Sequence, residues 1–508
     1  MPDPAARPLL IRGARVLTAG EDPHRPPPRD VLVRGDRIAA IFGAGDAPPD
    51  IPAETEVLDA AGCLLIPGLV SAHYHSYDTL LKGQFEDMPF DVWALHSQPA
   101  YWGRRSREEL RVRTLLGAME CLKAGITTIQ DMNSLVPQDE ETLDVILSAY
   151  EEAGIRVVFS IALRDLPDLD IAPFLPPDLP AEVAAIVGGK PGDPAADLAF
   201  VEAQVRRLSP LRPRLHWALS PSGPQRSSDA LLEGIAVLSQ AHGLPILTHV
   251  YETRAQLAKA RRVYAGLGGS MIRHMAERGI LTPRTTLAHA VHLTEEEVAL
   301  VAEAGAGVVH NPLANLKLKN GVAPLLSFKR AGIRMALGCD NSSCSDCQNL
   351  FQAMKMYCLL SAGSDANPTG VLACDAVEAA TAGGARALGL GEEIGALAPG
   401  MRADLVLLDL ADLAWQPFNS ATRQLVYSET GRGVRTVLVD GEVVVRDGHL
   451  TRVDEAAFRA ELAEVMERVD ADHAALRERV APAIAPLLAA NERLSRVDLG
   501  MRRLIGEG

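Results

Sequence analysis

Aromatic residues and cysteines are scarce in this sequence, and it contains no long hydrophobic run. Only 4% of its 508 residues are aromatic, and seven are cysteines, an odd number spread thinly. Such cysteine usage fits a reducing compartment rather than a secreted disulfide framework. No apolar run reaches the roughly 18–20 residues that span a bilayer, and the N-terminal residues lack the apolar core of a signal peptide. We therefore expect a cytoplasmic protein without a membrane-spanning segment.

Basic residues are also in deficit. Lys and Arg number 50 against 65 Asp and Glu, which gives a net charge of −15, and the two signs are interspersed. A surface that binds nucleic acid needs a basic stripe, so nucleic acid is excluded as a partner. The hydrophobic content of 47% is ample for a large core, and the length allows two or three domains.

The other motifs are arranged around one stretch, residues 64–83. An apolar run is broken by Pro67-Gly68, and a short strand follows that ends in His73-Tyr74-His75. Because side chains alternate on a strand, the two imidazoles point to the same side. Two imidazoles that converge at a strand end suit a divalent metal ion. The pattern occurs by chance in many chains, so its interpretation depends on the rest of the sequence.

Four further segments carry histidine or carboxylate residues at or after short apolar runs. They are Thr248-His249-Val-Tyr-Glu252, Leu287-Ala-His289, His310-Asn-Pro-Leu-Ala-Asn-Leu-Lys-Leu and Ala336-Leu-Gly-Cys-Asp340. Together with the segment from Pro67 to His75, they resemble the amidohydrolase superfamily, and more closely its branch of metal-dependent aminohydrolases and chlorohydrolases. The motifs follow the family order over about residues 8 to 450. Five motifs in order are specific, whereas any one alone is not.

Short apolar strands alternate with amphipathic helices between about residues 68 and 395. The expected strands are 68–72, 127–130, 156–163, 215–220, 245–249, 285–289, 307–310 and 333–338. Eight such alternations predict an α/β fold, a (β/α)8 TIM-like barrel with its active site at the C-terminal strand ends. The candidate residues His75, His249, His289 and Asp340 all fall at those ends.

The two ends of the chain have a different pattern of apolar and polar residues. Alternating, strand-like segments predict a small β-sandwich domain built from both ends, residues 1–66 and 397–453, around a barrel of residues 67–396. The resembling family has this arrangement. Residues 454–508 predict a helical tail, with helices over 455–467 and 473–488 that pack on the domain or contact another subunit. A homo-oligomer is therefore one expectation.

The resemblance implies a metal centre with a single ion. One divalent ion would be held by His73, His75, His249 and Asp340. Binuclear members need a bridging lysine near the end of the fourth strand, and the corresponding residues 217–226 contain none. Zinc is the first choice for nitrogen and oxygen ligands, with iron as the competitor.

The resemblance also implies a reaction. In the resembling deaminases, the glutamate at the position of Glu252 protonates a ring nitrogen, while metal-activated hydroxide attacks the neighbouring carbon of an N-heterocyclic small molecule and ammonia leaves. Asp340 would take the proton of the water, and His289 would contact the hydroxide or polarise the substrate, with His292 as its rival. The alternative is a hydrolase of a cyclic amide, or of a carbon–halogen or alkylamine bond of the s-triazine type.

Candidate substrate contacts are less well defined. Gln84, Trp93 and His96 follow the first motif and suit a flat heterocycle, although loop packing explains them equally well. Gln225 or Arg226 contacts the substrate, or the segment only builds a turn. His310 lines the pocket or is a structural histidine. The family's usual sequence after Asp340 is altered here, and a glutamate usual in the next helix is Ala353, which puts the substrate of any known member in doubt.

One cysteine cluster offers an alternative cofactor. Cys339-x4-Cys344-x2-Cys347 matches plant-type iron–sulfur spacing, with Cys358 as a fourth ligand. The competing and favoured interpretation is that these thiols pack in the core and the pocket wall.

Overall fold

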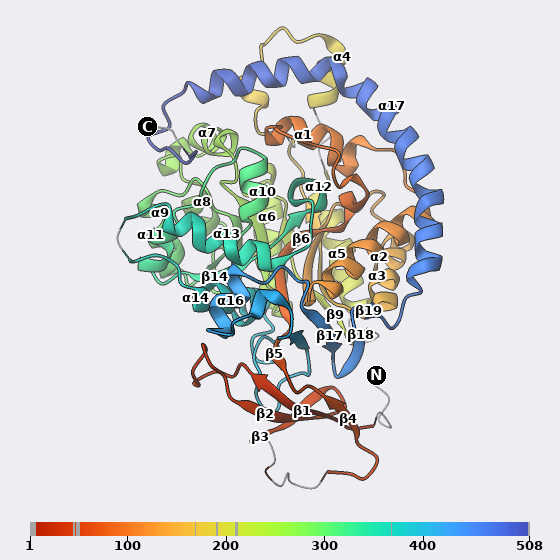
Figure 1. Ribbon diagram of the computed structural model, residues 1–508. Coiled ribbons are helices and arrows are strands. Elements are labelled where there is room, and N and C mark those ends of the chain that lie inside the picture. The colour runs from red at the N-terminus through yellow and green to blue at the C-terminus, as the bar shows by residue number, and fades with distance from the viewer. Residues whose placement is uncertain are drawn as a thin grey trace.

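A ring of parallel strands forms the centre of the computed structural model, which describes residues 7–43, 46, 51–167, 169–188, 192–208, 212–366 and 368–505 (Figure 1). Residues 1–6 and 506–508 of the predicted domains lie outside the described residues. The barrel strands are β6 Leu69–His75, β7 Ile126–Asn133, β8 Arg156–Leu163, β9 Leu215–Trp217, β10 Ser220–Pro221, β11 Ile246–Val250, β12 Thr285–His289, β13 Gly307–His310, β14 Arg334–Leu337 and β15 Asp340–Asn341.

The pairing closes this ring. β6, β7, β8 and the pair β9 and β10 are joined in parallel, as are β11 to β14. A parallel bridge between Leu219 and Ile246 joins the two groups, and β15 pairs with β6. Apolar side chains from successive strands, such as Val70, Val158 and Leu247, fill the interior. The prediction of a TIM-barrel-like α/β fold is confirmed.

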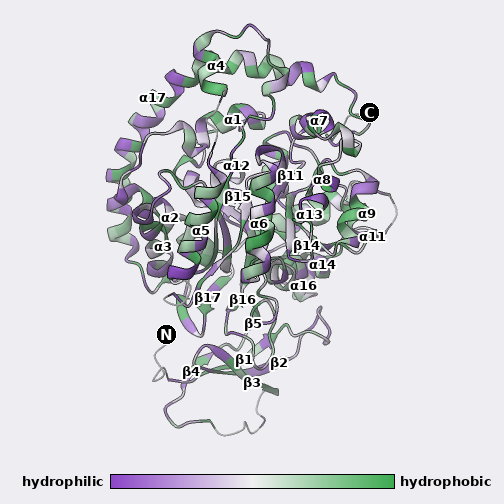
Figure 2. Cartoon of the chain, turned by 180° about the vertical axis from the view of Figure 1, so that it is seen from behind, coloured by the Kyte–Doolittle hydropathy of each residue, from purple (hydrophilic) through white to green (hydrophobic). Residues whose placement is uncertain are grey.

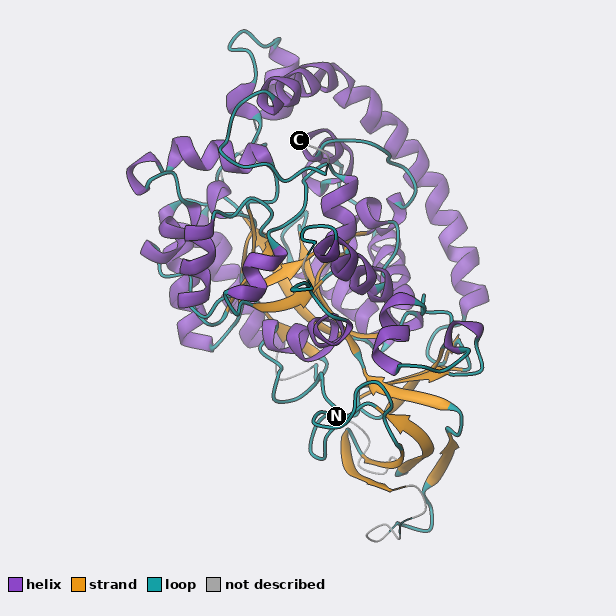
Figure 3. Cartoon of the chain, turned by 60° about the vertical axis from the view of Figure 1, so that its left-hand side comes forward, coloured by secondary structure: helices purple, strands orange, loops and turns teal. Residues whose placement is uncertain are grey.

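Helices cover the outside of the barrel (Figure 3). Their starts follow local signals: the Ser106 hydroxyl accepts from the backbone N–H of Glu109, and Thr294 forms a capping box with Glu297. The helices are α1 Phe90–Ser97, α2 Arg107–Lys123, α3 Glu140–Ala153, α4 Ala181–Val187, α5 Pro194–Leu208, α6 Asp229–His242, α7 Arg254–Val263, α8 Met271–Glu277, α9 Glu295–Glu303, α10 Pro312–Lys317, α11 Leu325–Arg330, α12 Ser342–Ser345, α13 Leu350–Ala362, α14 Ala373–Glu378, α15 Gly384–Ala387 and α16 Ala421–Tyr427.

Strands from both ends of the chain share one nine-stranded sheet below the barrel (Figure 1). β5 and β16 pair antiparallel and so join the two ends. At the start of β8, the buried Arg156 guanidinium donates to Asp404 and Asp440, which fastens the C-terminal strands to the barrel floor. The strands are β1 Leu9–Val16, β2 Pro28–Arg34, β3 Arg37–Gly43, β4 Glu56–Asp59, β5 Cys63–Pro67, β16 Leu405–Asp409, β17 Val434–Val439, β18 Glu442–Arg446 and β19 His449–Leu450.

The C-terminal region forms one helix, α17 Glu455–Ser495, where two were predicted. The prediction was wrong because residues 468–472 continue the helix and Pro482 and Pro486 are accommodated within it. Buried residues recur every three to seven positions along α17, so one face packs on the domain; Figure 2 shows apolar and polar residues alternating along it. None of the described helices is both long and apolar enough to cross a membrane.

A close approach of two strand ends depends on Gly338, between β14 and β15. A Cβ atom there would lie 2.4 Å from the Asn311 Oδ1 atom and 2.8 Å from the His73 carbonyl oxygen. Both distances are far shorter than van der Waals contact. Glycine therefore lets the chain leading to Asp340 pass directly against the end of β6.

We predict that Gly338→Ala lowers the free energy of unfolding by about 1–3 kcal/mol, because the added methyl group forces neighbouring backbone apart. Urea denaturation followed by circular dichroism measures the change. Gly103→Ala is the matched control, since a Cβ at Gly103 has nothing within 4 Å. Equal midpoints for the two variants would show that the close approach tolerates a side chain.

Candidate metal centre and active site

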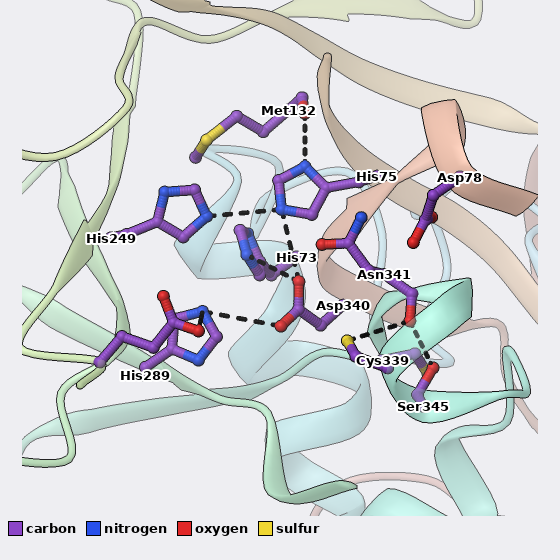
Figure 4. Close-up of polar contacts among 12 residues, drawn as sticks. His73, His75, Asp78, Met132, His249, His289, Cys339, Asp340, Asn341 and Ser345 are labelled. Carbon is purple, nitrogen blue, oxygen red and sulfur yellow. Dashed lines mark hydrogen bonds and ion pairs between the residues drawn. The ribbon is translucent and has the colours of Figure 1, made fainter. Parts of the chain in front are cut away.

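Three histidines from two strands, β6 and β11, converge with Asp340 at the C-terminal end of the barrel. The Nε2 atoms of His73 and His75 lie 3.5 and 3.3 Å from Asp340 Oδ1. His249, at β11, places its Nε2 atom 3.4 Å from that of His75. Figure 4 shows these rings arranged around the Asp340 carboxylate. The four predicted ligands are therefore brought together, and all four residues are buried or nearly so.

Neighbouring strands fix the orientation of two of these rings. His75 Nδ1 donates to the carbonyl oxygen of Met132 at 2.5 Å, and His249 Nδ1 donates to that of Ser222 at 2.5 Å. Each donor holds the ring in the tautomer whose Nε2 lone pair faces the centre. Two lone pairs that face each other repel, unless a cation lies between them.

His73 gives an independent test of whether these residues fit a metal ion. Within the described part of the chain, neither of its ring nitrogens has a hydrogen-bond partner, although the side chain is fully buried. Burial lowers the pKa of His73 to about 4 and that of His249 well below its usual value, so both rings are neutral at pH 7. Neutral imidazoles and a carboxylate are the donors that a divalent ion requires.

Asp340 is held as an anion. Burial alone would raise its pKa, but contacts with His73 and His75 outweigh this effect and hold the pKa well below its usual range. Its backbone φ is +62°, and that of His289 is +70°, in the left-handed region that non-glycine residues rarely adopt. Such strained conformations cluster at functional sites, where the surrounding structure enforces them.

Two buried aspartates fix the chain beside the candidate metal ligands. Asp131 accepts from the backbone N–H and the hydroxyl of Ser76, the residue after His75. Asp78 accepts from the backbone N–H groups of Ser342 and Ser343, just beyond Asp340. The ends of β6 and β15 are thereby held in register with each other.

Glu252 and His289 lie on the open side of this cluster. His289 Nε2 is 3.7 Å from Asp340 Oδ2 and 4.0 Å from Glu252 Oε1. The His289 Nδ1 atom donates to Asn315 Oδ1 at 2.7 Å, which turns Nε2 toward the centre. Burial, reinforced by the Asp340 carboxylate, raises the pKa of Glu252 to about 8, so this side chain holds a proton at pH 7. His292 was the alternative to His289. Among the described residues, it belongs to none of the groups of side chains that could together hold a metal ion.

A pocket opens beside these residues with aromatic and cationic walls. Trp93, one of the substrate contacts expected from the sequence, lines this pocket, and its Nε1 atom donates to Ser343 Oγ at 2.8 Å. The other lining residues include Tyr77, Phe90, Gln98, Tyr101, Ser134, Arg164, Leu169, Ser222, Arg226, Leu318 and Asn341.

Four other predicted substrate contacts are not among the described lining residues. Gln84 accepts from Arg477 of α17, and His96 packs against Phe85 and His473. Gln225 donates to Asp170 through its Nε2 atom. The His310 ring lies tilted against that of Tyr357 with centroids 5.6 Å apart, and burial lowers the pKa of His310 to about 3. These placements favour the packing interpretation of each residue.

Of the two residues Gln225 and Arg226, the described lining of the pocket includes Arg226. The Arg226 guanidinium donates to the buried carboxylate of Asp170, and the Lys259 ammonium group also donates to that carboxylate. One buried carboxylate thus faces two cations. The sequence gives no signal for three of the lining residues, because no motif contains Phe90, Tyr101 or Arg164. Asn315, which contacts His289, does lie within the motif that follows His310.

The cysteine cluster does not assemble as a cofactor site. Cys339 and Cys344 are buried free thiols, and Cys344 Sγ donates to the carbonyl oxygen of Asn341. No group of potential metal-binding side chains among the described residues contains a cysteine. The interpretation as packing thiols is supported.

A parallel barrel with buried histidines and an aspartate converging at its strand ends is the architecture of a metal-dependent hydrolase. The chain belongs to the amidohydrolase family, whose family model matches residues 64–444. It is 32% identical to a 5'-deoxyadenosine deaminase of Methanothermobacter thermautotrophicus over 90% of this chain and 97% of that protein. It is also 32% identical to a 5-methylthioadenosine/S-adenosylhomocysteine deaminase of Nitratidesulfovibrio vulgaris, over 90% and 96% of the two chains.

Solved structures have the same fold. An adenosine deaminase of Xanthomonas campestris with bound zinc superposes with a TM-score of 0.79 at 27% identity, over 91% of this chain and 98% of that one. An atrazine chlorohydrolase of Arthrobacter aurescens superposes with a TM-score of 0.77 at 23% identity, over 90% and 99%. The second likeness concerns the fold alone.

We predict that His249→Ala weakens retention of a divalent ion at least about 100-fold, because it removes a direct donor where even supporting residues cost 10- to 100-fold. Metal content after zinc reconstitution and dialysis, measured by mass spectrometry, tests this. His310→Ala is the matched control: it should retain the ion and lose about 1–3 kcal/mol of stability through lost packing. Equal metal content in both variants would contradict the ligand assignment.

Proposed function

We propose that this protein is a metal-dependent aminohydrolase that releases ammonia from a C–NH2 carbon of an N-heterocyclic small molecule. The observation that carries the proposal is Glu252, a buried carboxyl group with a raised pKa beside His289 and Asp340. A proton donor in that place suits attack on a ring carbon next to a basic nitrogen. The named relatives deaminate adenosine-type compounds, so aminopurine nucleosides are the first substrates to test.

We propose one zinc ion as the cofactor, held by His73, His75, His249 and Asp340. Three neutral nitrogens and one carboxylate oxygen suit zinc, and the Xanthomonas campestris relative was solved with zinc bound. When bound, such an ion supplies an acidified water, because zinc lowers the pKa of its water toward about 7. Iron remains the competing ion.

The chain's own residues then divide the proton transfers. Ionised Asp340 accepts the proton of the attacking water through Oδ2, the oxygen that faces His289, and passes it to the amino group, which leaves as ammonia. Protonated Glu252 donates to the ring nitrogen, while its Oε1 atom accepts from Asn320 Nδ2 at 3.0 Å. The hydroxyl group formed on the attacked carbon returns its proton to Glu252 as the carbonyl group of the product forms. His289 donates a hydrogen bond from Nδ1–H to Asn315 Oδ1. Its Nε2 atom is therefore free of a proton and can accept a hydrogen bond from the developing hydroxyl group.

The pocket walls orient the ring. Trp93 and Phe90 offer faces for a flat heterocycle, and Arg226 lies over the Phe90 ring with its central carbon 5.6 Å from the ring centre. Arg164 and Arg226 both line the pocket, which favours a substrate that presents a hydrogen-bond acceptor to them. We propose Trp93 and Arg226 as the principal substrate contacts.

We also propose a domain division for the chain. Residues 67–396 form the catalytic barrel, residues 1–66 and 397–453 form the small β domain, with a sandwich arrangement, and residues 454–508 form the tail. The β5–β16 pairing and a shared apolar core of strands from both ends support the joined β domain. A cytoplasmic location and a homo-oligomer stay predictions.

Ammonia release is the experiment that tests the function. Zinc-reconstituted protein is given a panel of aminopurine nucleosides, pterins, aminopyrimidines and s-triazines, with chloride and alkylamine followed in parallel. We expect ammonia from one compound class. Product from a cyclic amide or a chlorinated ring without ammonia would instead identify a different hydrolase, in which Glu252 serves another proton transfer.

We predict that Glu252→Gln lowers kcat for deamination by about 100- to 10,000-fold, because the amide cannot give a proton to the ring nitrogen. The variant should retain its zinc and its circular dichroism spectrum. Glu303→Gln, at the end of α9, is a control for the loss of a carboxylate elsewhere. An unchanged rate in Glu252→Gln would assign the proton transfer to another group.

A further inference from the structure

The chain beyond α17 returns to the active-site end of the barrel. In Figure 1, α17 arches around the barrel and the C-terminus lies beside α7. Residues 497–503, called the C-terminal clamp below, lie outside the matched family segment, which ends at residue 444. Leu499 in this clamp is 4% exposed, so the segment is docked and not loosely attached.

The first half of the clamp is fastened to α7. Arg254 Nη2 donates to the carbonyl oxygen of Val497 at 2.8 Å, and Arg261 Nη2 donates to that of Leu499 at 2.6 Å. α7 begins two residues after Glu252, and the Glu252 backbone N–H donates to Gln256 in its first turn. The position of α7 therefore sets the position of the Glu252 backbone.

The second half of the clamp is fastened to the segment that holds the Glu252 side chain. The Val322 N–H donates to the Arg503 carbonyl oxygen at 2.7 Å. The Arg503 side chain is itself held in place, because its Nη2 atom donates to the Leu293 carbonyl oxygen at 2.7 Å. The contact is close: a Cβ at Gly321 would lie 2.7 Å from the Arg503 carbonyl oxygen. Asn320, two residues before Val322, donates to Glu252 Oε1.

Asn320 also connects this segment to His289. Its backbone N–H donates to the Asn315 carbonyl oxygen at 2.8 Å, and the Asn315 side chain accepts from His289. The two groups on the open side of the metal centre are thus held by one short stretch, residues 315–322. That stretch and α7 are separate in sequence, and the clamp bonds to both.

We propose that the C-terminal clamp, residues 497–503, positions the carboxyl group of Glu252 by fastening α7 to the segment that carries Asn320. The proposal rests on the proposed function, because it is the proton transfer by Glu252 that makes its placement matter. The Asn320 amide donates to Oε1, which leaves Oε2 to carry the proton toward the substrate. The clamp residues touch no reacting atom and are positioning residues.

The test uses the full-length, zinc-loaded double variant Arg261→Ala/Arg503→Ala, which removes the α7 donor to Leu499 and the bond to the Leu293 carbonyl oxygen that holds Arg503 in place beside Val322. We expect kcat to fall about 10- to 100-fold, since small misplacements of a reacting group have effects of that size. KM and zinc content should stay within about twofold. Arg261→Lys/Arg503→Lys, which retains donors, should recover much of the lost kcat.

Arg496→Ala is the matched control. Arg496 lies just before the clamp, its side chain is 75% exposed, and it pairs with Glu492 on the helix surface. Its kcat should equal that of the parent, because exposed ion pairs contribute little. Arg261→Ala alone serves as the milder variant if the double variant does not fold, and it should lower kcat in the same direction.

Hydrogen–deuterium exchange provides a readout that does not need activity. We expect faster exchange in residues 252–256 and 315–322 of the double variant than in the parent. Faster exchange only in 497–503, with parental kcat and parental exchange near Glu252, would overturn the proposal. If the parent deaminates nothing, the proposed function fails, and the exchange pattern still decides whether the clamp orders the Glu252 segments.

Discussion

The structure depends on the burial of three imidazoles and one carboxylate around a single point. Their facing Nε2 and carboxylate oxygen atoms lie about as close as direct ligands of one ion would. Buried polar groups without partners cost free energy, and facing lone pairs add repulsion. Burial would lower the pKa of His75, but its contacts with Asp340 outweigh this effect and raise the pKa. The proposed metal ion would take the place of the proton on His75 Nε2, so its binding would be coupled to the ordering of the strand ends.

The orientation of each of these histidine rings is set by closure of the barrel and not by local sequence. His75 is oriented by a carbonyl group of β7, His249 by the carbonyl group of Ser222 just after β10, and His289 by Asn315 after β13. Each partner thus comes from the end of a neighbouring strand in the ring. A barrel whose strands slipped in register would keep its ligands and lose their orientation. This explains why a glycine is required at 338, where two strand ends pass within contact distance.

The strands, and the convergence of His73 with His75, could be predicted from the sequence because both depend on local patterns. Alternation on a strand brings His73 and His75 together, and apolar runs mark where the barrel strands lie. The pocket contacts depend on which distant segments meet. Gln84 is engaged by Arg477 of α17, 393 positions further along the chain, and Gln225 is turned away by Asp170. No rule of residue spacing predicts which distant segments meet. For that reason the sequence does not distinguish Arg226 from Gln225 as a substrate contact.

The proposed metal ligands and the proposed proton donor are held by different parts of the molecule. His73, His75 and Asp340 stand on paired strands, which are ordered by the barrel itself. Glu252 stands after a strand end and depends on α7, on Asn320 and, through them, on residues 497–503. The barrel can therefore be complete as a metal-binding scaffold while the donor is misplaced. A boundary drawn at the end of the family match would retain His73, His75, His249 and Asp340, and it would remove residues 497–503, which we propose order Glu252.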